Sequence, residues 1–164
     1  MTTNAPLTQI EESLKLSADG YVDLFEIQFH GSSTVARFWN GASKVWQGNT
    51  YEQLAVQMQG DTLSADGRAS RPLMTVVNPD KIFGTFAAEG YFDLSVVTRK
   101  RILQNDFINN VNAFSQNIWI VGRVTAVTAQ TLTLELRQTT DAPIWLTPRR
   151  TYNPPDFPFV TLSN

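Results

Sequence analysis

The sequence predicts a mainly β protein, an antiparallel β-sandwich or open β-barrel with one short inserted helix and a second helix at the N-terminus. About eight to ten short segments alternate apolar and polar residues, which is the periodicity of strands with one buried face. Gly, Asn and Asp turn signals separate these segments at the spacing of hairpins. The 164 residues are enough for one domain with a core of its own.

The N-terminal segment is predicted to form a short amphipathic helix. Its apolar residues recur at the spacing of one helical face, and they are Leu7, Ile10, Leu14 and Leu16. Thr8 is expected to cap this helix, with Glu11 three residues later at the capping-box position. Residues 17–20 read Ser-Ala-Asp-Gly, which is a turn signal that ends the segment.

Short strands are predicted from there to residue 77, and two of them, 51–57 and 73–77, fall in the stretch 46–78. In that stretch, aromatic and alternating apolar residues are divided by glycine turns. Asn40-Gly41 and Gln47-Gly48-Asn49 are expected to be hairpin turns. The predicted strands cover residues 21–29, 35–39, 44–46, 51–57 and 73–77.

The second half of the chain combines one helix with longer strands. Asn78-Pro79-Asp80 is typical of a helix start, with a cap followed by proline, and Gly90 is expected to end that helix. Residues 92–103 are predicted to form a long strand and residues 105–116 a polar surface loop. The last hairpin is expected to join residues 118–127 and 131–136.

A change in composition near residue 148 divides the chain into two predicted parts. Residues 1–148 are expected to form the β domain. Residues 149–164 hold three prolines interleaved with Phe157 and Phe159. We expect an extended arm there, because proline cannot donate to a strand ladder. Aromatic side chains in such an arm commonly pack on a neighbouring surface.

The sequence supports neither catalysis nor a cofactor, and a non-enzymatic protein without a metal is predicted. The absence of cysteine excludes disulfides, thiolate nucleophiles and cysteine-bound iron–sulfur clusters. His30 is the one histidine and has no catalytic motif around it. The net charge of −2 gives no electrostatic case for DNA or an anionic membrane. No secretory signal or apolar run long enough to span a bilayer is expected.

The composition favours contact with other proteins. Charged residues make up 17% of the chain, which also has four Trp and ten Phe, as is typical when other chains cover part of the surface. The densest basic run, Arg99-Lys100-Arg101, falls on a predicted strand, so consecutive side chains point to opposite faces. A solvated strand, an ion-paired contact between subunits and a contact with nucleic acid all remain open for this run.

An ordered set of short motifs resembles the lambda-type phage minor tail protein L family. The core of the set is Trp46-Gln47-Gly48 with Tyr51, Gly60, Gly67, Ser70-Arg71-Pro72 and Val76-Val77-Asn78. Flanking segments are also similar, namely TQIEESLKL with VDLFEIQF, VVTRKRILQNDF, IWIVGRVTAV with TLTLEL, and Pro148-Arg149-Arg150 with Tyr152. The resemblance covers roughly residues 7–152 and depends on the order and spacing of the motifs.

The resemblance implies a structural protein of a virion tail tip, assembled in the host cytoplasm, with the β domain of tail-tube and hub proteins. It implies a ring of copies, with three favoured and six also compatible, between the distal tail-tube protein and a central hub or fibre protein. The tape-measure protein is a further candidate partner. Full-length members of the family carry four cysteines described as holding an iron–sulfur cluster, and the absence of cysteine excludes that cluster here.

Candidate subunit-interface residues follow from this resemblance and from the surface chemistry. They are Arg99, Arg101, Phe107, Arg149, Arg150, Tyr152, Phe157 and Phe159. The alternative function is a carbohydrate-binding β-sandwich for recognition of a host surface. It requires exposed stacking platforms on one face, drawn from Trp39, Trp46, Trp119 and Trp145.

Overall fold

The computed structural model describes residues 5–15, 19–60, 71–78 and 81–139. The helices are α1 (Leu7–Ser13), α2 (Ile82–Ala88) and α3 (Gln104–Ile108). The strands are β1 (Tyr21–Gln28), β2 (Val35–Trp39), β3 (Lys44–Trp46), β4 (Asn49–Gln53), β5 (Val56–Gln59), β6 (Leu73–Val77), β7 (Val96–Leu103), β8 (Phe114–Val127) and β9 (Thr131–Gln138). This content confirms the predicted mainly β class.

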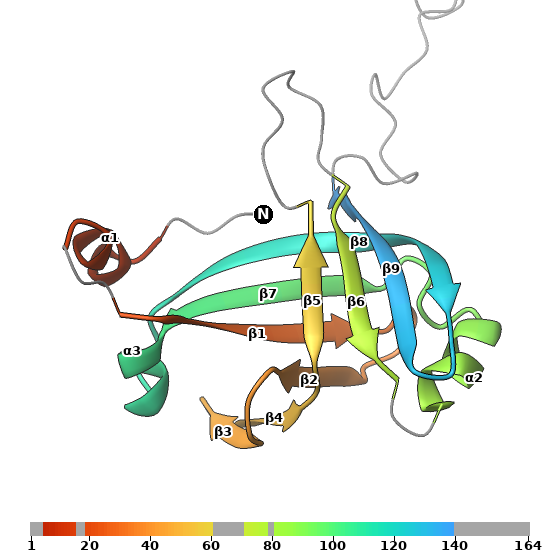
Figure 1. Ribbon diagram of the computed structural model, residues 1–164, viewed down its shortest axis with the longest axis horizontal. Helices are drawn as coiled ribbons and strands as arrows, with labels where there is room; N and C mark the ends of the chain where they lie inside the picture. The colour runs from red at the N-terminus through yellow and green to blue at the C-terminus, as the bar shows by residue number, and fades with distance from the viewer. Residues whose placement is uncertain (1–4, 16–18, 61–70, 79–80, 140–164) are drawn as a thin grey trace, which may run out of the picture.

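The strands form one nine-stranded sheet in the order β3-β4-β2-β1-β7-β8-β9-β6-β5. All pairings are antiparallel except a short parallel contact between β2 and β4. The sheet coils, so that β5, β6 and β9 cross over β1 and β7 (Figure 1). Strand β5 follows β4 in the chain yet lies at the opposite edge, which gives the sheet the shape of an open barrel.

The side chain of Asn40 helps to close this barrel. Its amide donates to the Val56 carbonyl at 3.0 Å, and its oxygen accepts from the Val56 N–H at 2.6 Å. The amide thereby satisfies both backbone groups of one residue on the edge strand β5. Asn40-Gly41 is therefore not the tight hairpin turn that the sequence predicted. A Cβ on Gly41 would lie 2.2–2.6 Å from the Trp39 ring, so the glycine is needed to accommodate the indole.

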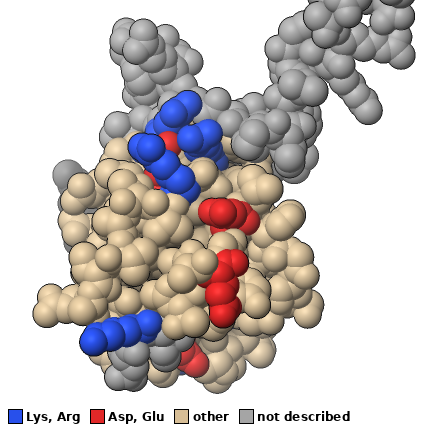
Figure 2. All heavy atoms as spheres, turned by 90° about the vertical axis from the view of Figure 1, so that its right-hand side faces the viewer, with Lys and Arg blue, Asp and Glu red and all other residues tan. Residues whose placement is uncertain are grey.

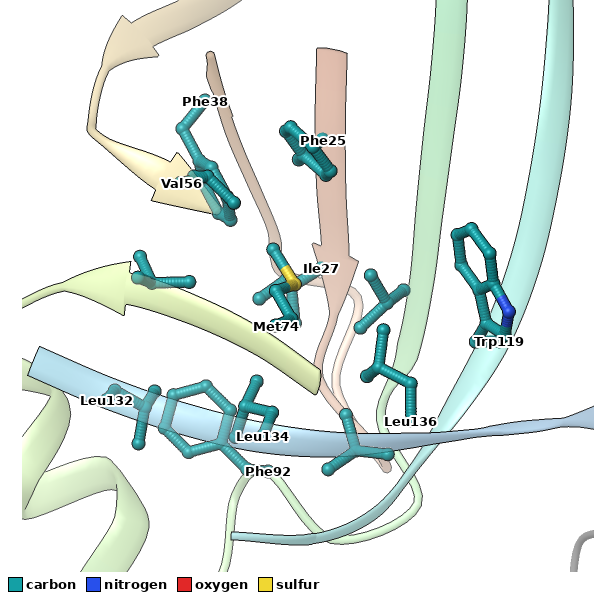
Figure 3. Close-up of a cluster of buried hydrophobic side chains, with 13 residues drawn as sticks. Phe25, Ile27, Phe38, Val56, Met74, Phe92, Trp119, Leu132, Leu134 and Leu136 are labelled. Atoms are coloured by element: carbon teal, nitrogen blue, oxygen red, sulfur yellow. The ribbon is translucent and has the colours of Figure 1, made fainter. Parts of the chain in front are cut away.

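The main hydrophobic cluster fills the barrel. Its buried side chains come from β1, β2 and β5–β9 and from Phe92 before β7. Figure 3 shows Phe25, Ile27, Met74 and Leu134 turned toward one another from strands far apart in the sequence. Helix α2 covers one end of the barrel, where Phe83 and Ala87 pack on the cluster.

A second cluster lies on the other face of β1 and β7. Leu24 and Ile102 are fully buried there, whereas the alternate residues Phe25 and Val97 face the barrel. The β3–β4 hairpin and α3 cover this second cluster with Trp46, Tyr51 and Phe107, which are members of the same cluster.

Most predicted strands are confirmed, and the hairpin at Gln47-Gly48 is a two-residue turn. Trp46 pairs with Asn49 across it, and both turn residues have positive φ, 49° and 75°. The predicted strand 51–57 is instead two strands, β4 and β5. The predicted strand 92–103 begins only at Val96, because hydrogen-bonded turns precede it and Leu94 has a φ of 59°.

Two other sequence expectations are wrong. Thr8 does not cap α1, whose N-cap position is Pro6 and which has no side-chain cap. Residues 105–116 are not a polar loop, because they contain most of α3 and the start of β8. Phe107, the one buried residue of α3, anchors the helix in the second cluster.

Candidate interaction surfaces

The basic run on β7 divides between the two faces of the sheet, as the strand alternation predicted. Arg99 lies on the barrel side and is only 8% exposed. Its guanidinium stands 5.3 Å from the centre of the Trp119 ring. Lys100 lies on the opposite side, among Trp46 and Phe114. The run is therefore no single basic patch, and most of it serves internal contacts.

Arg101 is the more accessible of the two candidate interface arginines on β7. Its guanidinium makes a two-point contact with the Asp23 carboxylate, at 2.9 and 3.1 Å, and its side chain is 44% exposed. The guanidinium also stands 5.7 Å from the centre of the Tyr21 ring. The Arg101 carbonyl accepts a hydrogen bond from the Gln9 side chain at 2.8 Å. Arg101 thus joins β1, β7 and α1.

Glu26 is the centre of a charged cluster that borders the second hydrophobic cluster. One of its carboxylate oxygens accepts from Lys100 at 2.8 Å and from the Tyr51 hydroxyl at 2.5 Å, and Arg37 lies 3.5 Å away. Burial opposes the charge, but these donors outweigh it and lower the pKa of Glu26. Burial and the bond to Glu26 raise the pKa of Tyr51. Glu26 is therefore charged and Tyr51 neutral at neutral pH, which fits a structural ion pair between Glu26 and Lys100.

Three arginines surround Glu135 on the outer side of β9. Arg123 contacts its carboxylate at 2.6 Å, Arg137 at 3.4 Å and Arg71 at 3.9 Å. Burial would raise the pKa of Glu135, but the arginines outweigh it and lower that pKa. Figure 2 shows basic side chains gathered around acidic atoms at the top of one face. The cluster is cationic overall, and sequence reasoning missed it.

Two features of β8 make this arginine cluster possible. A register shift between Val121 and Arg123 sets Arg123 opposite Glu135. A Cβ on Gly122 would come within 2.4–2.9 Å of the Arg137 side chain, so a larger residue there would displace this arginine from its present position. The signal available in the sequence is Glu135 itself, a charge within the alternating leucines of the last strand.

The end of the molecule that carries α1 and α3 has several exposed apolar residues. Exposed large hydrophobic residues belong to α1, the start of β1, β3 and the α3 region, and α1, α3 and the start of β1 lie toward one end of the molecule (Figure 1). These residues are Leu7, Ile10, Leu14, Tyr21, Val45, Ile108 and Val111. Exposed apolar patches of this kind mark contacts with other proteins.

A groove opens at the same end of the molecule. We call it the α3 groove, a hollow of about 340 Å³. Its lining consists of Val22, Trp39, Ala42, Ser43, Lys44, Gln104, Phe107 and Ile108. Lys44 is the one charged residue of this lining, and its ammonium donates to the carbonyls of Phe107 and Ile108 at 3.1 and 3.5 Å.

The structure locates only some of the predicted interface residues. Phe107 is 3% exposed and packs against Trp39, with ring centres 4.9 Å apart, so its side chain belongs to the domain's own core. Arg149, Arg150, Tyr152, Phe157 and Phe159 lie outside the described residues, as does the predicted boundary at residue 148.

The tryptophans do not form an exposed stacking surface in the described part of the chain. Trp46 and Trp119 are 1% and 4% exposed, and both belong to hydrophobic clusters. Trp39 is half-buried, and Trp145 lies outside the described residues. The carbohydrate-binding alternative therefore lacks the pair of exposed rings that it requires among Trp39, Trp46 and Trp119.

Metal sites and membrane-spanning helices are absent from residues 5–15, 19–60, 71–78 and 81–139. These ranges hold no group of three His, Asp or Glu side chains placed to bind a metal ion. None of the helices in the same ranges is long and apolar enough to cross a membrane. His30 is exposed, and its backbone N–H donates to the Ser95 hydroxyl at 3.2 Å.

Comparison with known proteins gives a structural likeness without a sequence match. No protein-family profile matches the chain, and no curated protein is similar to it in sequence. Among solved structures, the chain is similar to one from the virion of a native gene transfer agent particle, with a TM-score of 0.59 and 19% identity. The likeness covers 91% of this chain and 50% of that one, so this chain spans about half the length of its neighbour.

Proposed function

We propose that this protein is a non-enzymatic structural component of a phage-type virion tail. The observation that most supports it is the fold likeness to a chain of a gene transfer agent virion, which extends over 91% of the residues. The described surface agrees with this role, because it offers an apolar end and a cationic arginine cluster to neighbouring proteins.

Within the tail, we place the protein in a ring at the tip, between the distal tube protein and a central hub or fibre protein. The sequence motifs shared with the lambda-type minor tail protein L family support this finer assignment. Three copies are favoured and six are compatible with the symmetry of tails. Residues 149–164 act in this proposal as an arm that reaches a neighbour, through Arg149, Arg150, Tyr152, Phe157 and Phe159.

A deletion tests the role of the arm in the assembled particle. Removing residues 154–164 is expected to leave the thermal unfolding of the domain unchanged and to abolish its incorporation into tails. Quantitative mass spectrometry of purified particles measures incorporation and counts copies of the full-length chain. Normal incorporation of the truncated chain would contradict the arm's role. Absence of the full-length chain from particles would contradict the virion assignment itself.

A further inference from the structure

Helix α1 has an apolar face that the described part of the chain leaves uncovered. Leu7, Ile10 and Leu14 are 76%, 47% and 83% exposed. Their spacing of three and four residues places them on one side of the helix. The one buried residue of α1 is the polar Gln9, which ties the opposite side of the helix to the Arg101 carbonyl. The helix is thus held by its polar side with its apolar side outward.

A seven-residue helix of this kind lacks the usual sources of stability. It has no side-chain cap and buries no apolar residue against the barrel. Helices shorter than about 12–15 residues are marginal in water unless an amphipathic face is packed. The sequence nevertheless has a clean apolar stripe on α1, and residues 5–15, 19–60, 71–78 and 81–139 of the same chain supply no packing surface for it.

The α3 groove of a second copy fits this stripe. The groove is hollow and lined mainly by apolar groups, and it stays open in the same structure in which the α1 face stays exposed. The α1 face and the α3 groove of one molecule therefore do not cover each other. We propose that the apolar face of α1 in one copy docks into the α3 groove of a neighbouring copy.

Charge favours the chain itself as the partner. Glu11 lies about 40° around the helix from Leu7, at the border of the apolar stripe. Lys44 is the one charged residue that lines the groove. Its ammonium has three donors, of which two reach the carbonyls of Phe107 and Ile108. One donor is left to meet the Glu11 carboxylate of a docked helix. The two surfaces thus match in both apolar character and charge.

This inference rests on the proposed function, because the contact would join neighbouring copies in the proposed ring. The absence of cysteine allows a clean test with one thiol per chain. A Leu14→Cys chain is mixed with an Ala42→Cys chain under mild oxidation, both in solution and as the chains incorporated into purified particles. Peptide mass spectrometry identifies the disulfide that forms. Ala42 lines the groove and is exposed.

The expected result is a disulfide between residues 14 and 42 of different copies. A Leu14→Cys chain mixed with a Val127→Cys chain is the matched control, since Val127 is 44% exposed and lies beside Gly84 of α2. No disulfide is expected in that pair. Absence of the 14–42 disulfide both in solution and in particles would overturn the proposal.

Charged variants separate docking from folding. Leu14→Asp is expected to weaken self-association at least about tenfold, with the melting temperature unchanged because the side chain is exposed. Val127→Asp, the matched control, is expected to leave self-association intact. If Leu14→Asp is lost from particles that show no 14–42 disulfide, a different protein covers α1 and the proposal fails. If the disulfide forms in solution while the chain is absent from particles, the contact stands and the virion role fails.

Discussion

Helices α1 and α2 have seven residues each but opposite surroundings. At α2, Phe83 and Ala87 pack on the main hydrophobic cluster, and Phe86 stacks on Phe29 with ring centres 5.8 Å apart. The Asn78 side chain accepts from the Phe83 N–H at 3.0 Å and so satisfies one backbone donor of the first turn. All of these contacts that stabilise α2 come from residues of the same chain.

At α1, none of these supports is present. Gln9 is the one buried side chain, and the apolar stripe faces away from the barrel. Two helices of equal length are thus packed in one place and uncovered in the other. The difference teaches that the described fold accounts for the apolar residues of α2, whereas those of α1 are left for the proposed neighbour to cover.

Truncating one apolar residue in each helix gives the largest expected contrast. Phe83→Ala should lower the free energy of unfolding by about 2–3 kcal/mol, because its ring packs against Phe92 and the cluster. Ile10→Ala should change that free energy by less than about 0.5 kcal/mol, because the side chain is exposed. Chemical denaturation measures both. Equal losses would mean that α1 packs on its own domain.

Removing the polar group at the start of each helix gives a smaller contrast. Asn78→Ala should cost about 1–2 kcal/mol of unfolding free energy, because the side chain also donates to the Thr128 carbonyl at 3.2 Å and is 3% exposed. Thr8→Ala should leave that free energy within about 0.5 kcal/mol, since Thr8 makes no cap. A loss above 1 kcal/mol for the second variant would contradict the geometry of α1.

Acid should weaken the barrel that supports α2 without acting on the tie that holds α1. The folded pKa of Glu26 is lowered, so its stabilisation is present above the unfolded value of about 4.3 and is lost as the pH falls through the folded pKa. The Gln9 contact with the Arg101 carbonyl has no titrating group. Denaturation midpoints from pH 6 to pH 2 should fall less steeply for Glu26→Gln than for the unaltered chain. An identical slope would contradict the charged cluster.

Much of the barrel could be predicted from local sequence, because alternation and turn chemistry are local properties. Strands β2 and β6 match their predicted bounds, and the Gln47-Gly48 turn matches its signal. The errors arise where a contact with a residue distant in the sequence determines the local conformation. Asn40 resembles a turn residue in the sequence, but it bonds to Val56 across the barrel. Phe107 lies in a largely polar segment, but it is buried in the second cluster, and the residues around it form helix α3.

The interaction surfaces were less predictable, because exposure depends on how elements pack. The apolar spacing of α1 was visible in the sequence, but such spacing normally predicts a buried face. Only the structure shows that Leu14 is exposed and that Lys44 lines a groove formed together with residues from distant parts of the sequence. The arginines around Glu135 come from three strand regions that no local pattern connects.

Hydrogen–deuterium exchange on the isolated and the assembled chain tests the uncovered helix most directly. Amides of α2 should be protected in both states, and amides of α1 should gain protection only when copies associate. Leu14→Asp should abolish that gain. Equal protection of α1 in the dilute monomer and in the assembly would show that the helix needs no neighbour.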